Sequence, residues 1–127
     1  MKKKHITRVI CIMFVLTVLS ACGTSSVQSS FPTGMFLSES GPFKTEWRED
    51  GTYTSWMNGQ EITSGTYSVN GNELTYESDS YCDSLGAGKA TYAWTLEDDT
   101  LTFELKGEDE CSDRIGTLHQ ISWHKEP

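Results

Sequence analysis

Two cysteines, Cys82 and Cys111, have the clearest potential for chemistry in this chain of 127 residues. Cysteines in such a pattern either pair as a disulfide or bind a metal such as zinc. A zinc site would need two further nitrogen or sulfur ligands, and His119 and His124 are the histidines that lie near. On a strand, their i, i+5 spacing places them on opposite faces. We therefore predict a Cys82–Cys111 disulfide, with metal binding as the alternative.

Acidic residues gather around the two cysteines and could bind Ca²⁺, because hard cations prefer oxygen ligands. The group consists of Glu108, Asp109 and Glu110, together with Asp83 and Asp113. Its spacing differs from the Asp-x-Asp-x-Asp-Gly pattern of a known calcium loop. A solvated acidic rim is the favoured interpretation, and we expect no metal.

No set of residues matches a catalytic motif. A serine nucleophile would need a histidine base, and neither His119 nor His124 lies in a recognisable motif. No glycine-rich phosphate loop precedes a helical pattern. We therefore expect neither an enzyme nor a cofactor.

Aromatic side chains are the better candidates for a binding site. On alternating strands, seven of them would fall on the face that points into a barrel: Trp47, Tyr53, Tyr67, Tyr76, Tyr92, Trp94 and Phe103. A barrel of eight strands holds either a filled core or one small ligand. The short chain favours a filled core, and a pocket for a small apolar molecule is the alternative.

The N-terminus predicts export and attachment to a membrane. Four basic residues precede an apolar run from Val9 to Leu19 that is too short to span a bilayer as a helix. The following Leu19-Ser20-Ala21-Cys22 resembles the bacterial lipobox, which implies cleavage before Cys22 and a lipid on its sulfur. An ordinary cleaved signal that happens to precede a cysteine is the alternative. Residues 1–21 are thus read as a signal peptide, 22–31 as the lipidated cysteine with a flexible tether, and 32–127 as one domain.

The charge of the exported part limits its partners. Beyond residue 21 the chain has six Lys and Arg against all eighteen Asp and Glu, a net charge of about −12. Such a surface repels nucleic acid and anionic lipid headgroups. The membrane would therefore be contacted through the lipid on Cys22, and a basic protein is a conceivable partner.

Alternation of apolar and polar residues predicts an all-β domain, because side chains on a strand point to opposite faces in turn. The expected strands cover residues 34–38, 43–48, 52–57, 66–69, 74–77, 91–96, 101–106, 115–119 and 121–125. Turn residues such as Asn58-Gly59 and Asn70-Gly71 separate them and favour hairpins. We predict a small antiparallel up-and-down β-barrel of about eight strands, with a meander sandwich as the alternative.

Two longer connections, residues 78–88 and 107–113, interrupt the hairpins and contain the two cysteines. A disulfide would join them at one end of the barrel. That end would then carry an acidic group formed by Asp79, Asp83, Glu108, Asp109, Glu110 and Asp113.

The chain resembles the small lipocalin-like (calycin-type) domains of bacterial lipoproteins. Phe36 stands where the family pattern has Trp. The segments that carry the resemblance are 32–36, 49–53, the hairpin 65–75, the later hairpin 92–96 with 101–103, and the closing segment from Cys111 to Trp123. The resemblance implies a barrel with an apolar interior, a small apolar ligand, and Arg114 packed across the closed end. An arginine on the surface, paired with neighbouring carboxylates, is the alternative for Arg114.

Three functions follow as expectations. The first is a lipid-anchored barrel on the extracytoplasmic face of the cell membrane, at the cell surface or in the periplasm, that binds a small apolar ligand. The second is a protein-interaction or inhibitor module whose acidic loops contact a basic target such as lysozyme. The third is a structural envelope lipoprotein with no ligand.

Overall fold

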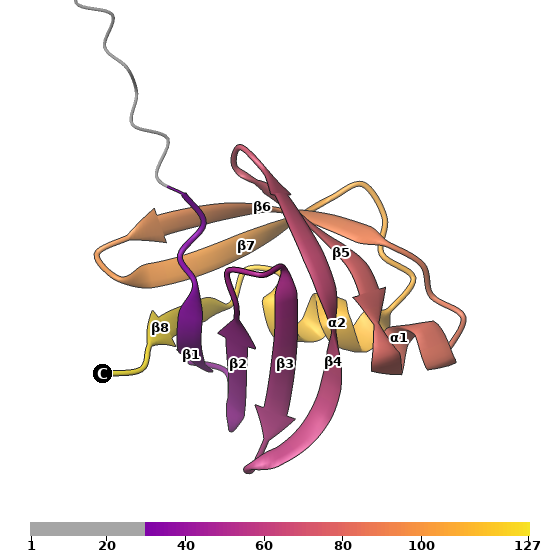
Figure 1. Cartoon of the computed structure of the whole chain (residues 1–127), viewed down its shortest axis with the longest axis horizontal. Helices are drawn as coiled ribbons and strands as arrows, with labels where there is room; N and C mark the ends of the chain where they lie inside the picture. Colours follow the sequence, from indigo (N-terminus) through magenta and orange to yellow (C-terminus); the bar gives the residue numbers. More distant parts are fainter. Residues whose placement is uncertain (1–29) are drawn as a thin grey trace, which may run out of the picture.

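Eight strands form a closed barrel in which each strand pairs with its neighbour in the chain and β8 returns to β1 (Figure 1). The computed structural model describes residues 30–127, so the predictions for the signal peptide and Cys22 lie outside it. All pairings are antiparallel, and the predicted all-β barrel is confirmed. The strands are β1 (Gly34–Ser38), β2 (Phe43–Trp47), β3 (Thr52–Met57), β4 (Gln60–Asn70), β5 (Glu73–Asp79), β6 (Ala90–Glu97), β7 (Thr100–Lys106) and β8 (Ser122–Lys125).

Tight turns join most neighbouring strands because their residues accept left-handed backbone angles. Asn58 and Gly59, between β3 and β4, have φ of 52° and 77°. Asp98 and Asp99, between β6 and β7, have φ of 48° and 63° without any glycine. Positive φ at both central residues matches the twist of paired strands, so these turns fix the hairpin register.

The strand expected at residues 115–119 is wrong, because Ser112–Leu118 form the helix α2. Its buried residues are Arg114 and Leu118, and their i, i+4 spacing defines one face of a helix rather than one face of a strand. Strand β4 also begins at Gln60, well before the predicted residues 66–69.

A second short helix, α1 (Ser80–Ser84), lies in the longer connection of residues 78–88. Asp79 caps its first turn, because the carboxylate accepts hydrogen bonds from the backbone N–H groups of Tyr81 and Cys82. The predicted disulfide is confirmed: Cys82 of α1 is bonded to Cys111, which directly precedes α2. Both cysteines are buried.

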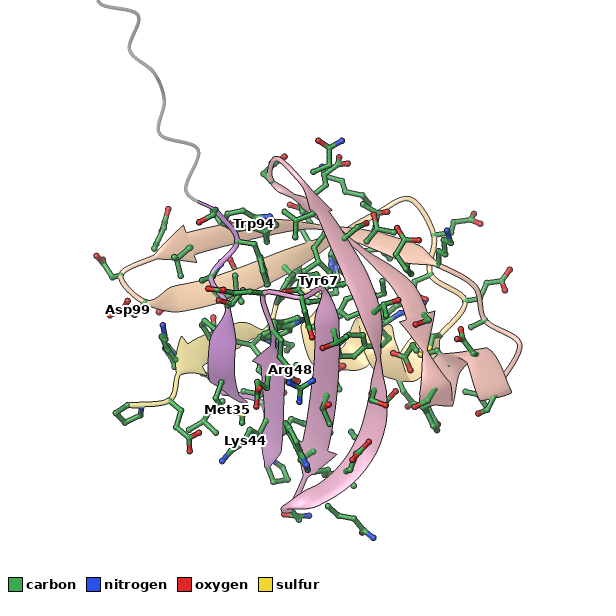
Figure 2. The ribbon with its side chains drawn as sticks, viewed as in Figure 1. Met35, Lys44, Arg48, Tyr67, Trp94 and Asp99 are labelled. Carbon is green, nitrogen blue, oxygen red and sulfur yellow. A yellow bond between two sulfur atoms is a disulfide. The ribbon has the colours of Figure 1, made fainter. Side chains whose placement is uncertain are left out.

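Aromatic side chains fill the end of the barrel at which residue 30 lies. The ring of Phe31 packs edge-on against Trp47, Tyr67 and Trp94, with centroids 5.8, 5.7 and 5.4 Å away. Figure 2 labels Tyr67 and Trp94 at this end. Phe31, counted with the tether above, is thus part of the core, and the packed domain begins one residue earlier.

Candidate functional site

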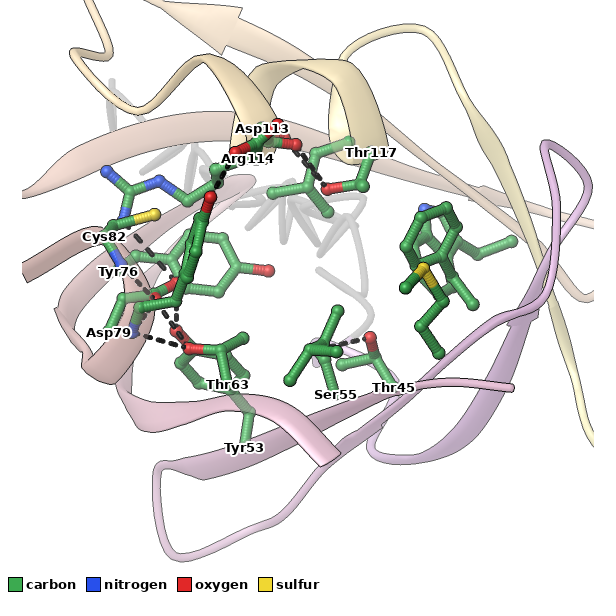
Figure 3. Close-up of a pocket in the computed structure, with 16 residues that line it drawn as sticks. Thr45, Tyr53, Ser55, Thr63, Tyr76, Asp79, Cys82, Asp113, Arg114 and Thr117 are labelled. Atoms are coloured by element: carbon green, nitrogen blue, oxygen red, sulfur yellow. Dashed lines mark hydrogen bonds and ion pairs between the residues drawn. The ribbon is translucent and has the colours of Figure 1, made fainter. Parts of the chain in front are cut away.

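A pocket of about 340 Å³ lies at the other end of the barrel, between strands β2 to β5 and helix α2 (Figure 3). The strand register places it there. Trp47, which contacts Phe31, pairs with Gly34 and Tyr53, whereas Phe43 pairs with Met57 at the opposite end of the same strands. Phe43 and Met57 both line the pocket.

Most of the pocket wall is apolar. Beside Phe43, the apolar lining side chains are Met57, Ile62, Leu118 and Trp123. Met57 and Ile62, from β3 and β4, and Tyr81 of α1 are about 40% exposed and form the rim, whereas Leu118 and Trp123 are buried. An apolar concavity with an exposed apolar rim is typical of a small-molecule site.

Two hydroxyl groups face the pocket from neighbouring strands. Alternation along β2 and β3 points Thr45 and Ser55 inward, and the register places them directly opposite each other. Their hydroxyl oxygens are 2.7 Å apart and hydrogen-bonded, as Figure 3 shows.

A buried ion pair closes the α2 side of the site. The guanidinium of Arg114 donates from Nε to Oδ2 and from Nη2 to Oδ1 of Asp109, both over 2.7 Å. The two side chains are 4% and 0% exposed. Nη2 also donates to the carbonyl oxygen of Gly88. Burial opposes the charge of Arg114, but the hydrogen bonds and negative charge of Asp109 outweigh it and raise the pKa of the guanidinium.

Asp79 joins the strands, α1 and α2 at this site. Its carboxylate accepts hydrogen bonds from the hydroxyls of Tyr53 over 2.6 Å and Thr63 over 2.5 Å, in addition to the two backbone groups of α1. Oδ2 lies 3.8 Å from Nη1 of Arg114. Burial, the neighbouring Tyr76 and the bond to Asp79 raise the pKa of Tyr53, so its hydroxyl stays a donor.

Arg114 therefore combines the two roles considered from the sequence. It is buried across the end of the barrel, where its guanidinium carbon lies 5.6 Å from the centre of the Tyr76 ring, and it is paired with carboxylates. The interpretation of it as a surface residue is wrong.

The acidic rim is smaller than expected. Asp79 and the Asp109 side chain are buried and paired with Arg114, because burial of a charge demands an opposite charge and hydrogen bonds. The remaining four acidic residues of the group are exposed: Asp83, Glu108, Glu110 and Asp113. Within residues 30–127 no cluster of histidine, cysteine and acidic side chains could hold a metal ion.

The seven predicted aromatic residues are all buried inside the barrel, but only Tyr53 and Tyr76 line the pocket. The other five, Trp47, Tyr67, Tyr92, Trp94 and Phe103, do not line it and belong to the packed core. The interior is therefore filled at one end and hollow at the other. Thr45, Ser55 and Trp123 were missed, although the same strand parity that selected Tyr53 also selects Ser55.

Of the two histidines, His119 differs from expectation and His124 lies on a strand as expected. His119 follows α2 instead of lying on a strand, and its Nδ1 accepts a hydrogen bond from the backbone N–H of Leu105. His124 lies on β8, where its ring contacts Thr100 and Glu39. Neither lines the pocket.

No family model, no curated protein and no solved structure matches this chain. None of the helices formed by residues 30–127 has the length and apolar character needed to cross a membrane.

Proposed function

We propose that this chain is an exported, lipid-anchored barrel that binds a small, largely apolar molecule in the pocket between β2 to β5 and α2. The observation that carries the proposal is the pocket itself, about 340 Å³ in volume and lined by aromatic and aliphatic side chains around a few polar groups. Sites for small molecules span about 300–1,000 Å³ and have this kind of lining. The volume lies at the lower end of that range, which suits a ligand of one or two rings better than a long acyl chain.

The position of the pocket supports a ligand that arrives from the aqueous phase. The packed domain begins at Phe31, at the end of the barrel opposite the pocket. If Cys22 carries lipid, the short segment between Cys22 and Phe31 holds the filled end of the barrel close to the membrane. The pocket then lies at the end of the barrel farther from the anchored residue.

A binding titration tests the proposal. A chain that begins at Gly23, secreted from a cleavable signal without a lipobox, keeps every residue that the structure describes. Titration with the uncharged fluorescent probe N-phenylnaphthylamine should give a saturable increase in emission, and extracted cell lipids and small apolar metabolites can then be tested as competitors.

Two variants locate the binding. Ser55→Phe places a ring inside the pocket and should weaken probe binding. Thr95→Phe adds the same ring at an exposed position of β6 and should leave binding unchanged. Absence of saturable binding, or equal loss in both variants, would overturn the proposal.

Contact with a basic protein is the second candidate function. The observation in its favour is that Asp83, Glu108, Glu110 and Asp113 stay exposed on two segments that the disulfide joins. Lysozyme capture that weakens with salt and with the double variant Glu108→Lys/Glu110→Lys would support it. Glu104→Lys on β7 is the control outside this acidic group. If it weakens capture equally, the attraction is a non-specific effect of charge.

A further inference from the structure

The hydroxyl of Tyr76 is a donor directed into the pocket. Tyr76 is 2% exposed, and Figure 3 shows its hydroxyl directed toward the middle of the pocket. The oxygen accepts a hydrogen bond from Nε1 of Trp47 over 3.3 Å. Its own hydrogen has no acceptor within residues 30–127. Burial raises the pKa of Tyr76, so this hydroxyl keeps its hydrogen near neutral pH.

The Thr45–Ser55 pair supplies a second donor. The pair makes one hydrogen bond, in which one hydroxyl donates to the other. A hydroxyl has one hydrogen, so the accepting hydroxyl keeps its own hydrogen unused, and the described part of the chain offers it no acceptor. Both residues line the pocket.

The buried carboxylate of the same pocket, that of Asp79, is already occupied. The carboxylate of Asp79 receives four hydrogen bonds, from the hydroxyls of Tyr53 and Thr63 and from two backbone N–H groups of α1. The site thus offers a ligand donors more readily than acceptors.

The buried charges disfavour an anionic ligand. Arg114 is the one cation in the lining, and it faces two carboxylates, Asp109 at 2.7 Å and Asp79 at 3.8 Å. Asp113, on the first turn of α2, adds a further negative charge to the lining. The local sum is negative, so a second anion would be repelled in a medium of low dielectric constant.

We propose that the pocket selects neutral, apolar molecules that carry a carbonyl-type oxygen, and that this oxygen accepts hydrogen bonds from Tyr76 and the Thr45–Ser55 pair. The inference rests on the proposed binding function and specifies its ligand class. Its physical basis is the cost of desolvation: water can satisfy these donors in the free protein, and a pure hydrocarbon that displaces water leaves them unpaired.

A matched series of three probes tests the inference on the chain that begins at Gly23. The series is β-acetonaphthone, its isostere β-isopropenylnaphthalene, in which C=CH₂ replaces C=O, and the anion β-naphthoate. Dissociation constants are measured by equilibrium dialysis. The ketone should bind about threefold to tenfold more tightly than the hydrocarbon, the range expected for one net hydrogen bond, and naphthoate should bind more weakly than the ketone.

Removal of the donors should abolish the preference for the ketone. In Tyr76→Phe/Thr45→Val/Ser55→Ala, which removes both hydroxyls of the pair, the dissociation constants of the ketone and the hydrocarbon should become about equal, because the hydrocarbon no longer leaves donors unpaired. Tyr67→Phe is the matched control, because it removes a tyrosine hydroxyl that donates to the Arg48 carbonyl outside the pocket. This control should keep the wild-type preference.

The outcomes separate the two proposals. If none of the probes binds saturably, the binding function itself is overturned. If the ketone and hydrocarbon bind the wild type equally, if naphthoate binds most tightly, or if the triple variant retains the preference, the ligand class is overturned and the binding function stands.

Discussion

Arg114 and Asp109 form a two-pronged ion pair inside one end of the barrel. Both N–H···O distances are 2.7 Å, and neither side chain is more than 4% exposed. The carboxylate also accepts hydrogen bonds from the Tyr92 hydroxyl and the Cys111 backbone N–H. This one contact therefore joins α2, β6 and the disulfide.

Loss of Asp109 should strongly destabilise the fold. In Asp109→Ala the buried guanidinium keeps Asp79, which lies 3.8 Å away, as its nearest carboxylate. Removing one partner of a buried ion pair costs about 3–5 kcal/mol in the free energy of unfolding. Urea unfolding followed by tryptophan emission measures the change. Glu110→Ala, at the exposed neighbouring residue, should stay within about 0.5 kcal/mol of the wild type.

The same ion pair should make the free energy of unfolding depend on pH in the acid range. Burial opposes ionisation of Asp109, but the hydrogen bonds from Arg114 and Tyr92 lower its pKa below the ordinary value of 3.8. A carboxyl with a lowered folded-state pKa stabilises the fold above its unfolded pKa and loses that contribution as pH falls through the folded value. The stability difference between the wild type and Asp109→Ala should therefore be full at pH 6 and shrink below about pH 4. A difference that stays constant down to pH 2 would contradict this.

Gly65 should tolerate no side chain. A Cβ at this position of β4 would lie 2.0 Å from the backbone oxygen of Ser78 on β5. Gly65→Ala must push these strands apart, with an expected loss of about 1–3 kcal/mol. Gly116→Ala in α2 meets no atom within 4 Å and should stabilise by about 0.4–1 kcal/mol. Thermal unfolding of both variants measures these changes. An unchanged midpoint for Gly65→Ala would contradict the close approach of Gly65 to the backbone of Ser78.

The disulfide should contribute about 3–4 kcal/mol to the free energy of unfolding, because it closes a loop between residues 29 positions apart. The double variant Cys82→Ser/Cys111→Ser should have a free energy of unfolding that is lower by that amount, and its urea midpoint should fall accordingly. Reductant should destabilise the wild type and leave the double variant unaffected. If reductant shifts both proteins alike, the effect does not come from this bond.

Cys22→Ser should move the protein from the membrane fraction to the soluble fraction, because the lipid predicted for this sulfur would be lost. Cys11→Ser, within the apolar run of the signal, should remain in the membrane fraction. Fractionation of cells that express each variant measures this. Cys22→Ser protein that still pellets with membranes would refute the lipobox interpretation.

The alternation of apolar and polar residues predicted most of the strands. Successive side chains on a strand face the barrel interior and the solvent in turn, so the two faces differ in residue type. Phe43, Thr45 and Trp47 share one parity and do point inward. The same parity could not separate Thr45, which lines the pocket, from Trp47, which is packed in the core. Both face the interior, and only the position along the closed barrel distinguishes them.

The sequence by itself determined the all-β class, the hairpin order and the pairing of Cys82 with Cys111, since alternation, turn residues and cysteine count are local or compositional signals. The tertiary structure decided the rest. It made residues 112–118 a helix, because Arg114 and Leu118 are buried together on one face. It also buried Asp79 and Asp109, which the sequence placed on an acidic rim, since the cost of burying a carboxylate depends on a cation that only the folded chain brings near.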